Sequence, residues 1–154
     1  MSAQVLYCQS PIGELTLAAE DSAVTHLLFG RVSFPGAIEE ETPLLKEARR
    51  QLEEYFACGR REFALPLKPR GTPFQEKVWQ ALLTIPYGET RTYQDIALLA
   101  GSPKAVRAVG SANHHNPISI FIPCHRVIGK NGSLTGYGGG LPAKRFLLEL
   151  EKGV

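Results

Sequence analysis

One segment fixes the architecture of this 154-residue chain: Thr92-Tyr93-Gln94-Asp95-Ile96-Ala97-Leu98-Leu99-Ala100-Gly101-Ser102-Pro103-Lys104-Ala105-Val106-Arg107-Ala108-Val109-Gly110-Ser111-Ala112. Its pattern predicts two short helices, over residues 92–99 and 103–112, joined by a tight turn. Ser102 can cap the second helix, and Pro103 suits its first position. Such a pair is typical of a helix-turn-helix, whose second helix contacts DNA. The same pair is also common as plain scaffold, so further evidence is needed.

The second predicted helix is built almost entirely from small side chains, with Lys104 and Arg107 as its basic residues. It offers few long side chains that could read base edges in the major groove. A slim helix can instead enter the narrower minor groove, where readout is degenerate. We therefore expect DNA binding with little sequence preference.

Outward from this segment, the first half predicts an α/β (α+β) domain with antiparallel strands and one main helix. Residues 4–10, 14–19 and 24–29 have strand-like patterns. Thr42-Pro43 signals the start of a helix that ends near Ala57. We expect this domain to span residues 1–67, followed by a linker at residues 68–71.

The remaining residues, 72–154, predict a mostly α domain that is winged-helix-like and contains the helix-turn-helix. Thr72-Pro73 repeats the signal for a helix start, and the helix runs to about Leu83. Trp79 lies among apolar residues at helical spacing, which favours a core position over a ligand contact.

Charge is unevenly distributed although the net charge is only +2. Residues 1–70 carry 8 basic and 10 acidic side chains, whereas residues 71–154 carry 9 basic and 5 acidic ones. No carboxylate occurs between Asp95 and Glu149, and six cations do. This segment favours a polyanionic partner, because cations release the counterions condensed on phosphate. A solvated basic face is the alternative.

The three cysteines, Cys8, Cys58 and Cys124, form no disulfide pattern, and we expect a reducing, cytoplasmic location. No secretory signal is visible, and no apolar run approaches the ~18 residues of a membrane span. We therefore expect no membrane association. Cys8, Cys58, His26 and His114-His115 lack a compact ligand spacing, so we expect no metal and no cofactor.

The segment Ile122-Pro123-Cys124-His125-Arg126-Val127 carries the chemistry. A neighbouring imidazole and guanidinium lower the pKa of a thiol and make it a better nucleophile. Adjacent side chains point apart on a strand and do not face each other on a helix, so Cys124 and His125 need a bend or a bridging water. A half-buried structural cysteine is the alternative for so short a motif.

The longer run strongly resembles the O6-alkylguanine-DNA alkyltransferases, the suicide repair proteins: Asn116-Pro117-Ile118-Ser119-Ile120-Phe121-Ile122-Pro123-Cys124-His125-Arg126-Val127. The resemblance extends from about Gly71 to Glu151. It is weaker in the first half, where Ser10-Pro11-Ile12-Gly13-Glu14-Leu15-Thr16-Leu17 carries it.

The resemblance implies irreversible transfer of an alkyl group from O6-alkylguanine, and also from O4-alkylthymine, to Cys124. His125 would deprotonate Cys124 through a water, and Glu151 would orient His125, with Glu149 as its competitor for that role. Tyr93 would donate toward the leaving guanine. Asn116 would link the DNA-binding turn to the active-site loop, although it could simply close a turn.

The resemblance also implies minor-groove binding to double-stranded DNA with the damaged base flipped out, and Arg107 filling the gap. The residues expected at the DNA are Arg107, Lys104, Ala105, Ser111, Arg126 and Thr92. Those expected in the alkylguanine pocket are Tyr93, Ser119, Val127, Tyr137 and Gly138. We expect a monomer that can bind DNA cooperatively.

Three alternatives compete with this interpretation. A non-catalytic lesion-binding protein would carry tryptophan in place of Cys124. A regulatory domain would need an additional module, for which the chain has no room. A cysteine hydrolase would need a glycine-rich oxyanion turn around the cysteine, and the sequence lacks one.

Overall fold

The computed structural model describes residues 3–153. They form two compact units, with the boundary between Pro69 and Arg70. This boundary falls inside the linker expected at residues 68–71. Each unit is described separately below.

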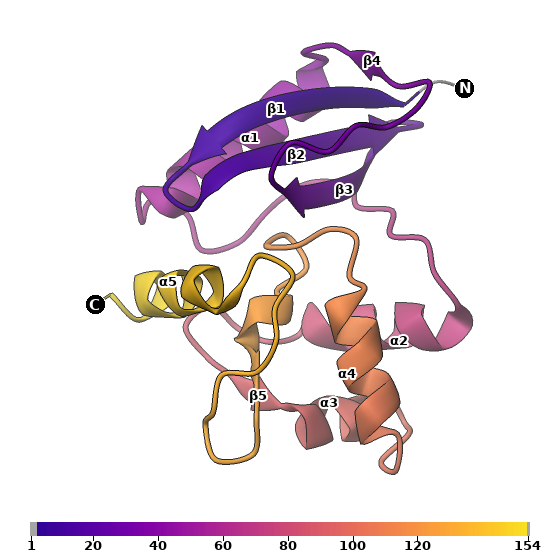
Figure 1. Cartoon of the computed structure of the whole chain (residues 1–154), viewed down its shortest axis with the longest axis vertical. Helices are drawn as coiled ribbons and strands as arrows, with labels where there is room; N and C mark the ends of the chain where they lie inside the picture. Colours follow the sequence, from indigo (N-terminus) through magenta and orange to yellow (C-terminus); the bar gives the residue numbers. More distant parts are fainter. Residues whose placement is uncertain (1–2, 154) are drawn as a thin grey trace. The chain divides into compact units, whose positions relative to one another are not determined.

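The first unit is a four-stranded sheet covered on one face by a helix (Figure 1). Its elements are β1 (Gln4–Ser10), β2 (Gly13–Glu20), β3 (Ala23–Phe29), β4 (Ile38–Glu39) and α1 (Pro43–Phe56). The sheet order is β3-β2-β1-β4, with antiparallel pairs except for β1 with β4. The expected antiparallel strands and single main helix are confirmed. The sequence pattern missed β4, because two residues are too few to show an alternation.

Helix α1 begins as its sequence predicts. The hydroxyl of Thr42 accepts a hydrogen bond from the Leu45 N–H (3.2 Å), and Pro43 occupies the first turn. One stripe of the helix is buried against β1 and β2 and comprises Leu45, Ala48, Gln51, Leu52 and Tyr55. The helix is therefore held by its apolar face as well as by its cap.

The second unit is mostly helical and contains seven short elements. They are α2 (Pro73–Leu82), β5 (Arg91–Thr92), α3 (Tyr93–Leu99), α4 (Val106–His114), the 3₁₀ turn η1 (Cys124–Arg126), β6 (Val127–Ile128) and α5 (Leu141–Lys152). Strands β5 and β6 pair in parallel. No helix described in residues 3–153 has the length and apolar character needed to cross a membrane.

Helices α3 and α4 form the helix-turn-helix, and α2 packs against both (Figure 1). A capping box at Thr92 and Asp95 starts α3. Helix α4 begins at Val106, three residues later than predicted. The Ala105 N–H bonds the Ser102 carbonyl (2.9 Å) and closes a turn, so Ser102 does not cap the helix. This corrects the predicted start at Pro103 and places Lys104 in the turn.

Trp79 anchors α4 to α2. The residue is 2% exposed, and its indole Nε1–H donates to the Ala112 carbonyl of α4 (2.8 Å). The expected core position is confirmed. Trp79 thus contributes both a buried apolar ring and a directional hydrogen bond. Together they limit how far α4 can move relative to α2.

Candidate functional site

Cys124 lies at the start of η1 and is buried, with 3% of its surface exposed. A run of tight turns leads to it. The Phe121 N–H bonds the Ser119 carbonyl (2.8 Å), and the Cys124 N–H bonds the Ile122 carbonyl (2.7 Å). Ile120 has φ = 71°, a left-handed conformation that is unfavourable for a β-branched residue. Such strain is typical of functional segments held in place by their surroundings.

Asn116 fastens this segment from the end of α4. Its Nδ2 donates to the Ile122 carbonyl (2.9 Å), while its Oδ1 accepts from the Ile118 N–H (3.0 Å). The two roles left open by the sequence therefore coexist: Asn116 closes a turn and also links α4 to the segment before Cys124.

His125 and Glu151 form a buried pair. The His125 Nε2 lies 2.7 Å from the Glu151 Oε2, and neither side chain is exposed beyond 1%. Within residues 3–153, the other ring nitrogen, Nδ1, has no hydrogen-bond partner. Glu149, the competitor, is exposed on the opposite side of α5. The geometry leaves His125 Nδ1 available to accept a proton.

Arg126 is not available to DNA, which corrects its expected place among the residues that contact DNA. Its guanidinium is buried, and it donates to both Glu151 oxygens (2.8 and 2.9 Å) and to the Ile85 carbonyl (2.7 Å). A charge placed in the interior requires such partners, because desolvation without them is costly. Arg126 therefore balances the Glu151 carboxylate rather than a phosphate.

The turn before β5 completes this network. The Gly88 N–H donates to Glu151 Oε1 (3.2 Å). Gly88 has φ = 80°, and a Cβ there would lie 3.3 Å from the Glu151 carbonyl oxygen. Glycine therefore serves both the turn and the close approach of α5.

Burial and hydrogen bonding shift the two central pKa values. Burial acts to raise the pKa of Glu151, but hydrogen bonds from His125 and Arg126 outweigh it and hold the pKa far below its usual value. Burial lowers the pKa of His125, against the opposing effect of Glu151. His125 is therefore neutral at physiological pH and competent as a base.

These shifts predict that the free energy of unfolding falls as the pH decreases from 7 to 4. As the pH falls, the unfolded chain binds a proton at His125 near pH 6.5 and at Glu151 at about pH 4.3. The folded protein binds neither proton at these pH values, because both of its pKa values are lower. Each such proton contributes a slope of up to about 1.4 kcal/mol per pH unit. Urea unfolding at several pH values measures it. In His125→Gln the slope between pH 7 and 5.5 should shrink, and an equal slope in both proteins would contradict the assignment.

The pKa of the Cys124 thiol is raised by burial, while hydrogen bonds from Asn116 and Ser119 and the charge of Lys144 lower it. Lys144 is a fully buried lysine of α5 whose Nζ donates to the Thr135 carbonyl (3.3 Å). Burial therefore keeps the thiol protonated until a base acts, and Lys144 favours the thiolate when it forms.

Tyr93 faces the same loop. Its hydroxyl lies 2.5 Å from the Thr135 Oγ1, and its ring is 4.0 Å from the Cβ position of Gly110 on α4. Tyr93, the first residue of α3, thus contacts both α4 and the loop that Lys144 holds.

The other predicted residues divide by exposure. Ser119, Val127 and Tyr137 are buried, whereas Gly138 is exposed. Of the residues expected at the DNA, Arg107, Lys104 and Ser111 are exposed, and Ala105 and Thr92 are half-buried. The Thr92 hydroxyl is engaged as the α3 cap, accepting from the Asp95 N–H (3.1 Å).

Sequence reasoning missed Lys144 and Thr135 as site residues. Lys144 lies seven residues before Glu151, so both fall on the same buried stripe of α5 as Leu147 and Leu148. That helical spacing was the available signal for Lys144. Thr135 lies in an irregular loop, where no periodicity could indicate it.

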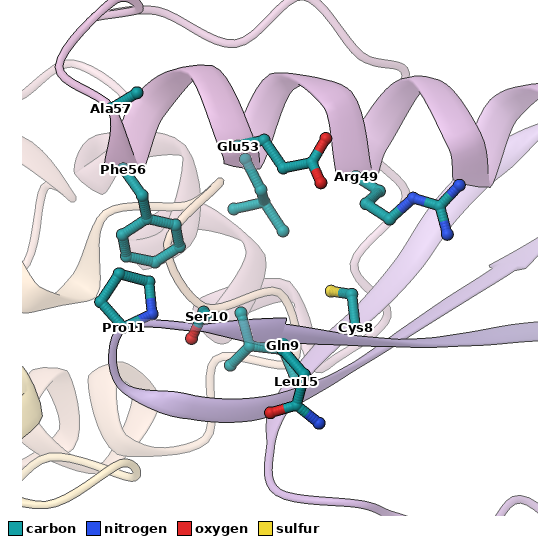
Figure 2. Close-up of a pocket in the computed structure, with 10 residues that line it drawn as sticks. Cys8, Gln9, Ser10, Pro11, Leu15, Arg49, Glu53, Phe56 and Ala57 are labelled. Carbon is teal, nitrogen blue, oxygen red and sulfur yellow. The ribbon is translucent and has the colours of Figure 1, made fainter.

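The first unit has a separate pocket of about 320 Å³, between the β1–β2 hairpin and α1 (Figure 2). Phe56 and Pro11 form apolar walls, and Arg49 and Glu53 contribute charged groups. Its cysteine, Cys8, has a pKa raised by burial, which makes the thiol less reactive. In the part of the chain that the structure describes, no three His, Cys, Asp or Glu side chains gather as a metal site.

Comparisons with known proteins cover both units. The family model for the 6-O-methylguanine DNA methyltransferase ribonuclease-like domain matches residues 5–69, and that for its DNA binding domain matches residues 73–153. A constitutive methylated-DNA–protein-cysteine methyltransferase of Bacillus subtilis is 53% identical over 152 residues, covering 94% of this chain and 92% of the relative.

Mycobacterium tuberculosis provides two further matches. Its methylated-DNA–protein-cysteine methyltransferase is 55% identical over 146 residues, covering 93% of this chain and 88% of the relative. The crystal structure of M. tuberculosis OGT in complex with DNA has a TM-score of 0.91 and 52% identity, covering 97% of this chain and 93% of that one.

Proposed function

This chain belongs to the 6-O-methylguanine DNA methyltransferase family, which repairs DNA by direct reversal of damage, and we propose that Cys124 is the residue that accepts the alkyl group. The proposed donor is O6-alkylguanine in double-stranded DNA, and O4-alkylthymine is a second donor. The observation that carries the proposal is a buried thiol beside a buried imidazole–carboxylate pair.

The proposed reaction is a one-step displacement. The Cys124 sulfur forms a bond to the alkyl carbon as the bond from that carbon to guanine O6 breaks, and the electron pair stays with guanine. The thiol proton passes through a water to His125 Nδ1. Guanine takes up a proton from water on its ring and leaves as the neutral base, and the imidazolium later returns its proton to water, so that one proton is transferred overall from the thiol to guanine. Glu151 stabilises the transient imidazolium. Tyr93 donates a hydrogen bond toward the departing base.

The product is a thioether, which water does not cleave. Each molecule therefore reacts once, and no cofactor takes part. The site is built from residues of one chain, which suits a monomer. The three free cysteines of the chain suit the reducing cytoplasm.

The alkyl group on O6 is inaccessible within a stacked duplex, so the proposal requires the base to be flipped out. Helix α4 presents small side chains and an exposed Arg107, which suits the minor groove. Arg107 would then occupy the space that the flipped nucleotide leaves.

We predict that Arg107→Ala slows alkyl transfer on duplex DNA, because loss of the filling side chain favours return of the base to the stack. A penalty of a few kcal/mol for unstacking corresponds to a loss of about 10- to 100-fold. Quenched-flow transfer kinetics on duplex and single-stranded DNA would measure it. Lys104→Ala is the control: it should weaken binding and reduce the salt slope by about 1 without this duplex-specific loss. Equal losses on both substrates would contradict the role.

The function itself is tested by intact-mass analysis after incubation with duplex DNA carrying O6-methylguanine. We expect one methyl group per protein molecule, mapped to Cys124 by peptide analysis, and no further turnover with excess DNA. Repeated turnover, or methylation at Cys8 or Cys58 instead, would refute the proposal.

A further inference from the structure

Two asparagines at the end of α4 hold the backbone on both sides of Pro123. Asn116 Nδ2 donates to the Ile122 carbonyl (2.9 Å), and Asn113 Nδ2 donates to the Cys124 carbonyl (3.4 Å). The site described above includes Asn116 and gives Asn113 no role. Yet Asn113 is the residue of α4 that bonds the nucleophile's own peptide group.

Asn113 is an unfavourable choice for stability alone. Its side chain is 4% exposed, its one hydrogen bond is long, and its Oδ1 has no partner within the described residues 3–153. A buried amide oxygen without a partner destabilises the folded state, and an apolar residue of the same shape would avoid that cost. Departures of this kind from favourable packing are expected at functional positions.

Asn113 lies on the buried side of α4, the helix whose exposed side is proposed to contact DNA. It lies with Val109 and Ala112 on the buried stripe of the helix, whereas Arg107 is exposed. Trp79 holds this same part of α4 through the Ala112 carbonyl. The hydrogen bond of Asn113 therefore links the position of α4 to that of the Cys124 carbonyl.

We propose that Asn113 is a positioning residue for alkyl transfer, through which the docking of α4 on DNA sets the location of the Cys124 thiol. The inference rests on the proposed function, because it assumes that α4 docks on DNA and that Cys124 reacts. In-line displacement requires the sulfur close to the alkyl carbon, and a misplacement of about 1 Å can cost about 100-fold in rate.

The test compares Asn113→Leu with wild type in four measurements: the methyl-transfer rate at saturating duplex, the dissociation constant for undamaged duplex, the rate with a free O6-alkylguanine base, and the melting temperature. We expect the saturating duplex rate to fall about 10- to 100-fold. The dissociation constant should stay within about twofold, and the melting temperature should be unchanged or higher, because the unpartnered oxygen is gone. The reaction with the free base does not use α4. The factor by which the substitution slows the free-base reaction should therefore be at least about five times smaller than the factor for the duplex.

Gln80→Leu is the matched control, an amide-to-leucine change at an exposed position of α2, and it should change none of these values. If Asn113→Leu does not fold, the same criteria apply to Asn113→Ala. A variant that transfers methyl at the wild-type rate, or that slows only in proportion to lost stability or DNA affinity, would overturn the inference. Wild-type protein that gains no methyl group would instead refute the proposed function.

Discussion

Cys124→Ser is expected to lose alkyl transfer while keeping its fold and its affinity for DNA. A serine hydroxyl is a far weaker acid than a thiol, so His125 cannot generate useful amounts of the alkoxide, and we expect a rate loss of at least about 1,000-fold. Serine is nearly isosteric with cysteine, and Cys124 is only 3% exposed. Asn116 and Ser119 can hydrogen-bond a hydroxyl oxygen as well as the sulfur. Intact mass after incubation with methylated duplex measures the transfer, and a gel-shift assay measures binding.

The control for Cys124→Ser is the double variant Cys8→Ser/Cys58→Ser, which retains Cys124 as its one cysteine. It should become methylated at the wild-type rate, because neither residue belongs to the site. Removal of the lesion by Cys124→Ser would show that another group accepts the alkyl carbon. Normal binding with no transfer would separate recognition from chemistry.

The sequence predicted helices best where a cap and an apolar stripe coincide. Thr42-Pro43 and Thr72-Pro73 are followed by α1 and α2, and the Thr72 capping box is present. The same reasoning placed the start of α4 three residues early. Ser102 and Pro103 are typical of a helix start, but here they form a separate turn whose bond runs from the Ala105 N–H to the Ser102 carbonyl. Local propensity does not distinguish the two arrangements.

In the site, the relative placement of the adjacent residues Cys124 and His125 was harder to predict than the helices. Cys124 and His125 could cooperate only through a bend, and η1 supplies it. The charge of Arg126 is evident from the sequence, but the direction of its side chain, which points inward to Glu151, is not. Arg126 and Glu151 lie more than 20 residues apart along the chain. Contacts between such distant residues depend on tertiary packing, which local sequence patterns do not show.

The sequence contains a signal for Asn113, a polar residue at a helix position where an apolar one is expected. Asn113 falls on the buried stripe of α4 at the spacing of Val109, where an apolar residue is expected. A polar residue on such a stripe indicates either a buried hydrogen-bond partner or a functional role. Only the structure identifies the Cys124 carbonyl as its partner.

Glu151→Gln is expected to impair both stability and activity, because one carboxylate binds both the His125 imidazole and the Arg126 guanidinium. Its oxygens accept from His125 Nε2 and from Arg126 at 2.7 to 2.9 Å. The variant keeps the shape but leaves the Arg126 charge buried without a counterion, which should lower the free energy of unfolding by about 3–5 kcal/mol. His125 loses the group that orients it, and alkyl transfer should slow by about 100-fold or more. Urea unfolding and single-turnover kinetics measure the two effects.

The two effects should separate in the double variant Glu151→Gln/Arg126→Met. With the unpaired guanidinium removed, much of the stability should return, since replacing a buried ion pair by groups of similar volume is often nearly neutral. The rate should stay low, because His125 still lacks the carboxylate. Glu149→Gln, an exposed carboxylate on the same helix, should change stability by no more than about 0.5 kcal/mol. A double variant that regains the wild-type rate would show that Glu151 serves only to balance Arg126, and His125 would then act without an orienting partner.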